Sequence, residues 1–449
     1  MSLSFTNKSC FCLTFLISLT TSVSCTSIEK SVDVVNSDCI GETKRFENAK
    51  IWHNKEFNVG SFDVNNGVFI KTDVCGQPNE IVNLDGAWVT PPFGDAHSHQ
   101  LESVFMFPRF NQELIATGIL YVFNPNADPR LMSKILSLAS EPGTVDVRTT
   151  YGGITSKYGH PQGGLSLEVA KFLYPNQTRD QMDGYVFHSV DSMQQISSTI
   201  DRLHDQGAKW VKVYLHKSEE YDQRKRLVST QAVEDGLRYS KGEYMFGLNP
   251  KLFKPLVEEA HRRHMKVIAH VSTAEDLRIA IRGNVDALGH LPGAYAVDRK
   301  DLDSKRLRRT DIELLVSKKG LSITPTFAAR PEYTNGELRD ELINMQRALV
   351  QKLYRAGVDI NLGVDNYSKN SSSEYQYWYE NNFLNSRELL AVWINSGQFI
   401  FSDRKIGAIK TGFEASFLVF EENPAEKLNA INHLRSTYIK GREAFNAEN

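Results

Sequence analysis

The chain has 449 residues, of which 41% are hydrophobic and 24% are charged, with 29 glycines and 15 prolines. This composition excludes disordered, collagen-like and disulfide-scaffold proteins and predicts a soluble globular protein with a large core. The 52 Lys and Arg residues nearly balance the 54 Asp and Glu residues, and a formal charge of −2 provides no field that would collect nucleic acid. We therefore expect a small, roughly neutral molecule as the substrate and no nucleic acid partner.

Residues 1–25 have the pattern of a signal peptide. Lys8 precedes an apolar run at 10–23, and small polar residues follow it. That run is too short to cross about 30 Å of hydrocarbon, and no later segment approaches the roughly 20 apolar residues of a membrane helix. We expect an exported protein, periplasmic or extracellular. Residues 22–25 are similar to a bacterial lipoprotein signal, so a lipid anchor at Cys25 is an alternative to ordinary cleavage.

Cysteine usage agrees with an oxidising compartment. Beyond Cys25 the sequence contains Cys39 and Cys75 and no other cysteine. The two thiols can form a disulfide or stay unpaired, and both alternatives remain open. Cysteine-based zinc sites and a thiol nucleophile are excluded from the main domain.

Residues 40–88 are predicted to form the N-terminal part of a small β domain. Short β-rich runs at 49–52, 67–71 and 81–84 are separated by turns rich in Gly, Asn and Pro. No long helical period interrupts them.

Residues 89–400 show strands alternating with helices. The predicted helices are 249–264, 273–283, 310–320 and 336–357, and several begin at an Asn or Thr cap and end at Gly. This alternation predicts a parallel sheet, and eight strands in a segment of this length match the roughly 250 residues of a (β/α)8 barrel. The active site of such a barrel lies at the carboxyl ends of its strands. The strand-like runs are 89–99, 118–123, 145–150, 210–215, 267–271, 287–291, 321–327 and 360–365.

The end of the chain returns to a β pattern. A helix at 386–396 leads into β-like segments at 406–420 and 436–444. We expect residues 401–449 to rejoin the first β segment, so that both chain ends form one β-sandwich domain. The predicted fold is therefore α/β, a TIM-like barrel with a small β sandwich.

Histidines and an aspartate stand where the predicted strands end. His97 and His99 close the first strand, and the period of two places both on one face, toward the barrel mouth. His270 and His290 end strands five and six, and Asp365 ends strand eight. Imidazole and carboxylate are ligands that zinc and similar divalent ions prefer. Five such groups at one rim predict a metal centre, whereas a single histidine there would more often be a core residue.

Lys212 ends strand four, where an ammonium group would repel metal ions. Either its pKa is strongly lowered, or a modification converts it into an anionic oxygen ligand. The simpler alternative is a rim lysine in a salt bridge.

Together these motifs resemble the amidohydrolase superfamily over nearly the whole chain. Residues 97–99 match its HxH motif, Lys212 its strand-four lysine, His270 and His290 its histidines on strands five and six, and Asp365 its strand-eight aspartate. Segments 153–164 and 256–293 look most like its imidazolonepropionase-like and Xaa-Pro dipeptidase-like branch.

The resemblance implies a binuclear centre of two divalent ions, with zinc as the expected metal. Six residues would hold the ions: His97, His99 and Asp365 the first, His270 and His290 the second, and Lys212, carboxylated by carbon dioxide, both. A hydroxide that bridges the metals would attack a carbonyl group, with Asp365 as general acid and base. The expected reaction is hydrolysis of an amide or peptide C–N bond.

Three further residues are candidate substrate contacts, namely Tyr214, His160 and Arg330. The arginine is included because a guanidinium group suits a carboxylate. The substrate itself stays open among dipeptides, N-acyl amino acids, cyclic amides and lactones, and the sequence does not indicate the oligomeric state.

Two other functions remain open. A mononuclear deaminase of the same superfamily would carry a Glu soon after the strand-five histidine, but here residues 271–273 are Val-Ser-Thr. A barrel kept as a non-catalytic binding module would have lost ligands, and none of the six is missing.

Overall fold

The computed structural model describes residues 39–161, 167–227, 245–334 and 336–448. The predicted signal peptide, with Cys25, lies outside these residues, so export and lipid anchoring stay predictions. Within the described ranges, no helix combines the length and the apolar character that crossing a membrane requires.

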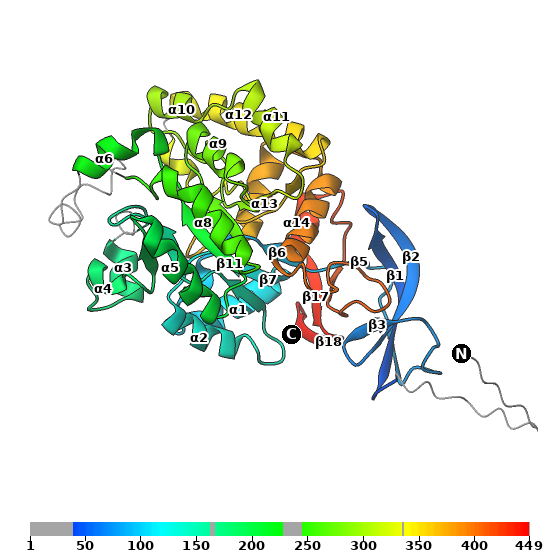
Figure 1. Cartoon of the computed structure of the whole chain (residues 1–449). Helices are drawn as coiled ribbons and strands as arrows, with labels where there is room; N and C mark the ends of the chain where they lie inside the picture. Colours follow the sequence, from blue (N-terminus) through cyan, green and yellow to red (C-terminus); the bar gives the residue numbers. More distant parts are fainter. Residues whose placement is uncertain (1–38, 162–166, 228–244, 335, 449) are drawn as a thin grey trace, which may run out of the picture.

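Strands from both ends of the chain hydrogen-bond into one eight-stranded sheet (Figure 1). Its order is β18-β17-β16-β5-β1-β2-β3, with β4 beside β1. The two-layered sandwich and the domain limits stay predictions. The strands are β1 (Thr43–His53), β2 (Glu56–Asn65), β3 (Val68–Ile70), β4 (Glu80–Asn83), β5 (Trp88–Thr90), β16 (Phe417–Phe420), β17 (Leu434–Ile439) and β18 (Arg442–Asn446).

This sheet curls around an aromatic core. The ring of Phe46 lies 5.2 Å from that of Phe62 and 4.9 Å from that of Phe417. The N–H of Phe69 donates to the carbonyl of Phe413, which ties β3 to the segment before β16. Cys39 and Cys75 form a disulfide, so the alternative of two unpaired thiols is wrong.

The remaining main strands pair in parallel, in a three-stranded and a seven-stranded sheet. The extended segment from β8 to β9 bends at Tyr151. Its first part, β8, pairs with β7, and its second part, β9, pairs with β11. The strands are β6 (Phe93–Asp95), β7 (Ile119–Asn124), β8 (Asp146–Thr149), β9 (Gly153–Thr155), β10 (Phe187–Ser189), β11 (Trp210–Tyr214), β12 (Lys266–His270), β13 (Ala287–Leu288), β14 (Ser322–Ile323) and β15 (Asp359–Ile360).

Backbone hydrogen bonds also join the last strand to the first. The N–H of Ala96 donates to the carbonyl of Leu362 over 2.8 Å, and the N–H of Val364 donates to that of His97 over 3.1 Å. These bonds join the segment after β15 to the segment after β6, an arrangement that agrees with the predicted barrel, which itself stays a prediction.

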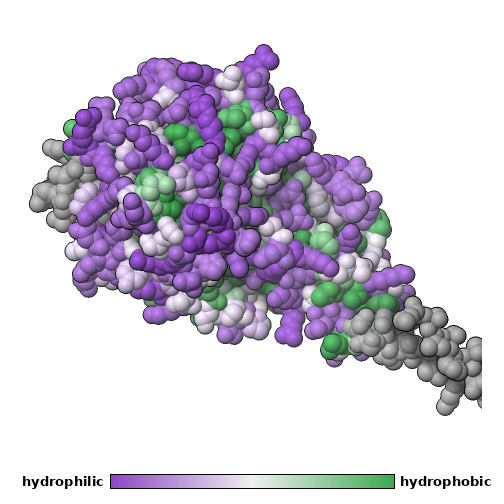
Figure 2. All heavy atoms as spheres, in the orientation of Figure 1, coloured by the Kyte–Doolittle hydropathy of each residue, from purple (hydrophilic) through white to green (hydrophobic). Residues whose placement is uncertain are grey.

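Helices lie outside these parallel strands (Figure 1). Most of the face of the molecule that Figure 2 shows is hydrophilic, with small apolar areas scattered over it. Asn249 and Thr273 cap α8 and α9, as predicted. The helices are α1 (Phe107–Ala116), α2 (Pro129–Leu138), α3 (Leu167–Leu173), α4 (Arg179–Met182), α5 (Met193–Asp205), α6 (Tyr221–Leu227), α8 (Pro250–Arg262), α9 (Ala274–Arg282), α10 (Arg299–Lys305), α11 (Arg309–Ser317), α12 (Gly336–Arg355), α13 (Ser371–Glu380), α14 (Ser386–Ile400) and α15 (Leu428–Ile431), with short 3-10 turns η1 (Gln100–Glu102), η2 (Ser218–Glu220) and η3 (Pro331–Tyr333).

The structure corrects one predicted strand. The run 89–99 is not a single strand: β5 belongs to the sheet of the chain ends, and β6 begins the parallel strands. Pro91 and Pro92 stand between them, and a proline cannot donate to a strand ladder. Among the elements that were not predicted are β2, β9, β10 and α13. The strands β9 and β10 have three residues each, β2 is interrupted by Gly60 and polar residues, and α13 begins with three serines.

Candidate metal centre

His97, His99 and Asp365 meet at the ends of β6 and β15. Each offers one ligand atom, and these atoms all lie within 4.8 Å of one another. Asp365 Oδ1 is 3.0 Å from His99 Nε2 and 3.4 Å from His97 Nε2. The N–H of Asp365 donates to the carbonyl of His97 over 2.7 Å, so the backbone itself holds the aspartate against the first strand.

The other ring nitrogen of each histidine is held by the protein. His97 Nδ1 lies 2.8 Å from the carbonyl oxygen of Gly289, and His99 Nδ1 bonds to Glu102 Oε1. Carbonyl and carboxylate oxygens only accept, so each Nδ1 donates its hydrogen. The lone pair of a neutral ring is then at Nε2, the atom that faces Asp365, which is the arrangement that metal-binding histidines use.

His290 and His270 extend the cluster. His290 Nε2 lies 3.8 Å from Asp365 Oδ2, and its ring centroid is 4.6 Å from that of His97 and 4.4 Å from that of His270. His290 Nδ1 is 2.7 Å from the hydroxyl of Thr326. His270 Nε2 is buried and has no hydrogen-bond partner among the described residues. A buried polar atom of this kind calls for an explanation, and a bound ion would supply one.

Lys212 is buried beside these rings, with 1% of its surface exposed. A Cβ placed on Gly289 would lie 3.0 Å from Lys212 Nζ and 3.3 Å from His97 Cε1, so the amine and the imidazole lie against the same glycine. Burial lowers the pKa of Lys212 to about 8. The buried position disagrees with the alternative of a rim lysine in a salt bridge and agrees with a lowered pKa.

Burial sets the charge of most of the histidines. It lowers the pKa of His290 to about 3, since the ring is far from water. His99 differs: burial alone would lower its pKa, but Glu102 and Asp365 outweigh it and raise the pKa to about 9. The pKa of Asp365 is held well below its ordinary value by His97, His290 and His99, although burial acts in the opposite direction.

Two of the three predicted substrate contacts lie beside this cluster. The ring of His160 is 4.8 Å from that of His270, and the ring of Tyr214 is 5.1 Å from His160 and 5.7 Å from His270. Arg330 has an exposed side chain that donates to the hydroxyl of Tyr333 over 2.9 Å. The pKa of Arg330 is raised: burial alone would lower it, but Tyr333 and the negative charge of Asp365 outweigh that effect.

Sequence reasoning missed two members of the site. His216 is buried, and its ring lies 5.6 Å from that of His160 and 5.7 Å from that of His270. It stands four residues after Lys212, so the strand period could have placed both on one face. Glu102 stands three residues after His99, a spacing that could have identified it as the partner of that histidine.

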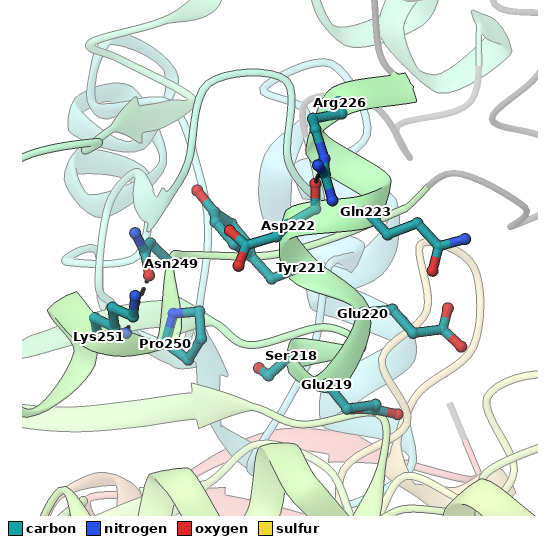
Figure 3. Close-up of a pocket in the computed structure, with 10 residues that line it drawn as sticks. All are labelled: Ser218, Glu219, Glu220, Tyr221, Asp222, Gln223, Arg226, Asn249, Pro250 and Lys251. Atoms are coloured by element: carbon teal, nitrogen blue, oxygen red, sulfur yellow. Dashed lines mark hydrogen bonds between the residues drawn. The ribbon is translucent and has the colours of Figure 1, made fainter.

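A cavity of about 250 Å³ lies elsewhere, beside η2 and α6 (Figure 3). None of the predicted site residues lines it. Glu219 and Glu220 at its edge already bond to Thr273 and Arg224. The cavity is therefore separate from the histidine cluster.

Residues around the cluster suit a divalent cation. Three imidazoles present Nε2 to one carboxylate, and a fourth has an unpartnered nitrogen. Nitrogen and oxygen donors of this kind are those that zinc and similar ions take. The group of His97, His99 and Asp365 can hold a metal ion as it stands.

No family model matches the sequence, and no curated protein matches it either. Solved structures do match. A crystal structure described as an amidohydrolase superposes with a TM-score of 0.64 over 90% of this chain and 99% of that chain, at 17% identity. The chain has the amidohydrolase fold.

Other solved structures are about as similar. The ochratoxinase of A. niger has a TM-score of 0.66 at 16% identity, covering 90% of this chain and 95% of its own. A Xaa-Pro dipeptidase with bound methionine in its active site has a TM-score of 0.65 at 14% identity, covering 90% of this chain and 100% of its own. The predicted resemblance and these similarities therefore point to the same fold.

Proposed function

We propose that the protein is a metal-dependent hydrolase of the amidohydrolase superfamily that cleaves an amide or peptide C–N bond of a small substrate. The observation that carries this proposal is the convergence of His97, His99 and Asp365, with both Nδ1 atoms held by outer partners. Further support comes from solved structures of the same fold, described as an amidohydrolase and as a Xaa-Pro dipeptidase.

The centre is proposed to be binuclear, on a (β/α)8 barrel. The ligands would be His97, His99 and Asp365 for one divalent ion, His270 and His290 for the other, and carboxylated Lys212 for both. The chemistry that a pair of zinc ions supplies when bound is activation of a water molecule and polarisation of a carbonyl group. The lowered pKa of Lys212 supports the carboxylation, because only a neutral amine adds to carbon dioxide.

Asp365 is proposed as the general acid and base. Its low pKa keeps the carboxylate ionised at neutral pH, so Oδ1 and Oδ2 can accept a proton from the attacking water. The same oxygens then return the proton to the leaving amine. Its partly exposed position, beside buried imidazoles, gives the substrate access to the carboxylate.

Substrate contacts are proposed for Tyr214, His160 and Arg330. The first two lie beside His270, where a group bound at the cluster would touch them. Arg330, which donates to the hydroxyl of Tyr333, would meet a carboxylate at the other end of the substrate. Dipeptides and N-acyl amino acids carry such a carboxylate, and both belong in a hydrolysis screen.

Metal analysis combined with such a screen tests the function. About two ions per chain and hydrolysis of an amide substrate would support the proposal. One ion, with deamination instead, would favour the mononuclear deaminase. No metal in a folded protein, and no turnover, would favour the binding module.

We also propose that the protein is exported, on the pattern of residues 1–25. Cell fractionation of the full chain and of a chain that lacks these residues tests the proposal, since the shortened chain should stay in the cytoplasm. A Cys25→Ser chain that leaves the membrane fraction would identify a lipid anchor, and an unchanged distribution would exclude it.

A further inference from the structure

A buried carboxylate on α13 holds the loop that follows β14. Glu374 is completely buried, and its Oε1 accepts from the N–H of Phe327 over 2.8 Å and its Oε2 from that of Ala328 over 2.6 Å. The indole N–H of Trp378 also donates to Oε1, over 2.7 Å. Three donors to one buried carboxylate fix its position, so the backbone at 327–328 is tied to the helix.

We call these bonds of Glu374 to the backbone at 327–328 the clamp. The residue just before it, Thr326, contacts a predicted metal ligand. Thr326 is completely buried, and its hydroxyl lies 2.7 Å from His290 Nδ1. Its φ is 55°, a left-handed conformation that β-branched residues rarely adopt. Such a backbone persists only where its surroundings hold it, and the clamp by Glu374 begins at the next residue.

We propose that Thr326 is a positioning residue for His290 and that Glu374 keeps Thr326 in place. In this arrangement His290 Nδ1–H donates to Thr326 Oγ1, and the lone pair of the ring is at Nε2, which faces Asp365 over 3.8 Å. The opposite tautomer would carry a hydrogen at Nε2 and could not bind a cation there. The inference rests on the proposed function, since it assigns His290 to a metal.

The hydroxyl distinguishes His290 from the other two histidines with outer partners. The carbonyl of Gly289 and the carboxylate of Glu102 can only accept, so they leave no choice of tautomer. A hydroxyl can accept or donate. An experiment can therefore determine which of the two groups, the Thr326 hydroxyl or His290 Nδ1, donates the hydrogen.

Two substitutions of Thr326 distinguish the effect of its hydroxyl from the effect of its side-chain shape. Thr326→Val keeps the branched side chain and removes the hydroxyl, whereas Thr326→Ser keeps the hydroxyl. Loss of an outer partner weakens metal binding by roughly 10- to 100-fold, so we expect this loss for T326V and less than about a threefold change for T326S. Competition with a chelator, on the full chain loaded with zinc, measures the affinity.

A second pair of variants tests the clamp. Glu374→Gln places an amide N–H₂ against a backbone N–H donor, which should loosen the loop and weaken zinc binding by about tenfold. Glu380→Gln is the control, because Glu380 is exposed at the end of the same helix. If T326V does not fold, as judged by circular dichroism, this pair carries the test.

The tautomer is measured without metal. Nitrogen-15 shifts of labelled histidine in the metal-free protein, assigned with His290→Gln, should show the Nδ1–H form in the wild type and its loss in T326V. Unchanged tautomer and zinc affinity in T326V would overturn the positioning role, and so would equal affinities of E374Q and E380Q. A wild-type chain that binds no zinc would instead overturn the proposed function.

Discussion

The candidate centre has two halves, the group His97, His99 and Asp365 and the pair His270 and His290, and among the described residues only the first half is a complete group of three ligand side chains. In the first half, His97, His99 and Asp365 bring their ligand atoms within 4.8 Å of one another. In the second half, the rings of His270 and His290 lie 4.4 Å apart, but within the described ranges no third His, Cys, Asp or Glu completes a group of that kind with them.

The difference lies in the chemistry of the remaining ligand. Lys212 is buried beside both halves, but an amine brings no negative charge to a metal. In the proposed binuclear centre the first half therefore has three ligands of its own besides Lys212, whereas the second has two and depends more on the modified lysine. We infer that the first half is preorganised and that the second is completed by the reaction of Lys212 with carbon dioxide.

Removing a histidine from each half gives the largest expected effect. His97→Ala should lower turnover by at least roughly 10³-fold, the scale on which single groups that stabilise a transition state act, with the circular dichroism spectrum largely kept. His270→Ala should lose turnover as well but keep one ion per chain, because the first half remains intact. Substantial activity in H97A would contradict the site.

Lys212→Ala tests the link between the halves. The variant should lose activity and bind fewer metal ions, since the proposed bridging ligand is gone. Short carboxylic acids such as acetate should restore part of the activity if a carboxylate is what the lysine supplies. An unmodified amine in a high-resolution, metal-loaded structure would refute this role.

Replacing Glu102, the hydrogen-bond partner of the ligand His99, should affect zinc binding less than replacing a metal ligand does. Glu102→Gln keeps an acceptor for His99 Nδ1 but removes the charge, so the affinity for zinc should fall by about tenfold. Glu113→Gln, on the exposed side of α1, is the matched control. Equal zinc affinities of the two variants, measured by competition, would show that the first half is held without Glu102.

The pH dependence of Lys212 tests the modification that is proposed for the second half. At pH 7 a pKa of about 8 leaves about a tenth of the amines neutral, against less than about one in a thousand for an ordinary lysine. The neutral fraction rises with pH and reaches half of the free amine near pH 8, so the metal-free protein should form carbamate already near neutral pH, where an ordinary lysine forms almost none. Carbon-13 NMR under labelled carbon dioxide at fixed pressure measures it, and carbamate that forms only at the pH values of an ordinary lysine would contradict the lowered pKa.

The smallest effect on the centre is expected from the disulfide. Cys39→Ser together with Cys75→Ser should lower the free energy of unfolding by about 2–4 kcal/mol, because the cross-link restricts the unfolded chain. The metal affinity should not change, since the bond joins the segment before β1 to the turn between β3 and β4, outside the candidate centre. Denaturant titration and zinc competition on the same variant check both statements.

How much of the fold the sequence could predict depends on the length of each element. Long periodic helices such as α8 and α9 were located within two residues, because their caps are local signals. The strand β9 has three residues and the helix α13 begins with three serines, so neither gives a clear period. Tertiary contacts, not propensity, decide such elements.

By itself, the sequence determined the chemistry available to this protein: five side chains at strand ends, of types that bind divalent ions, follow from strand periodicity and from where each run stops, with Lys212 at the end of a further strand. Only the tertiary structure decided which atoms of those side chains face one another. The hydrogen bonds of His97 to Gly289 and of His290 to Thr326 join residues that are distant in the chain. No local pattern encodes such contacts, because they arise only when separate strands pack side by side.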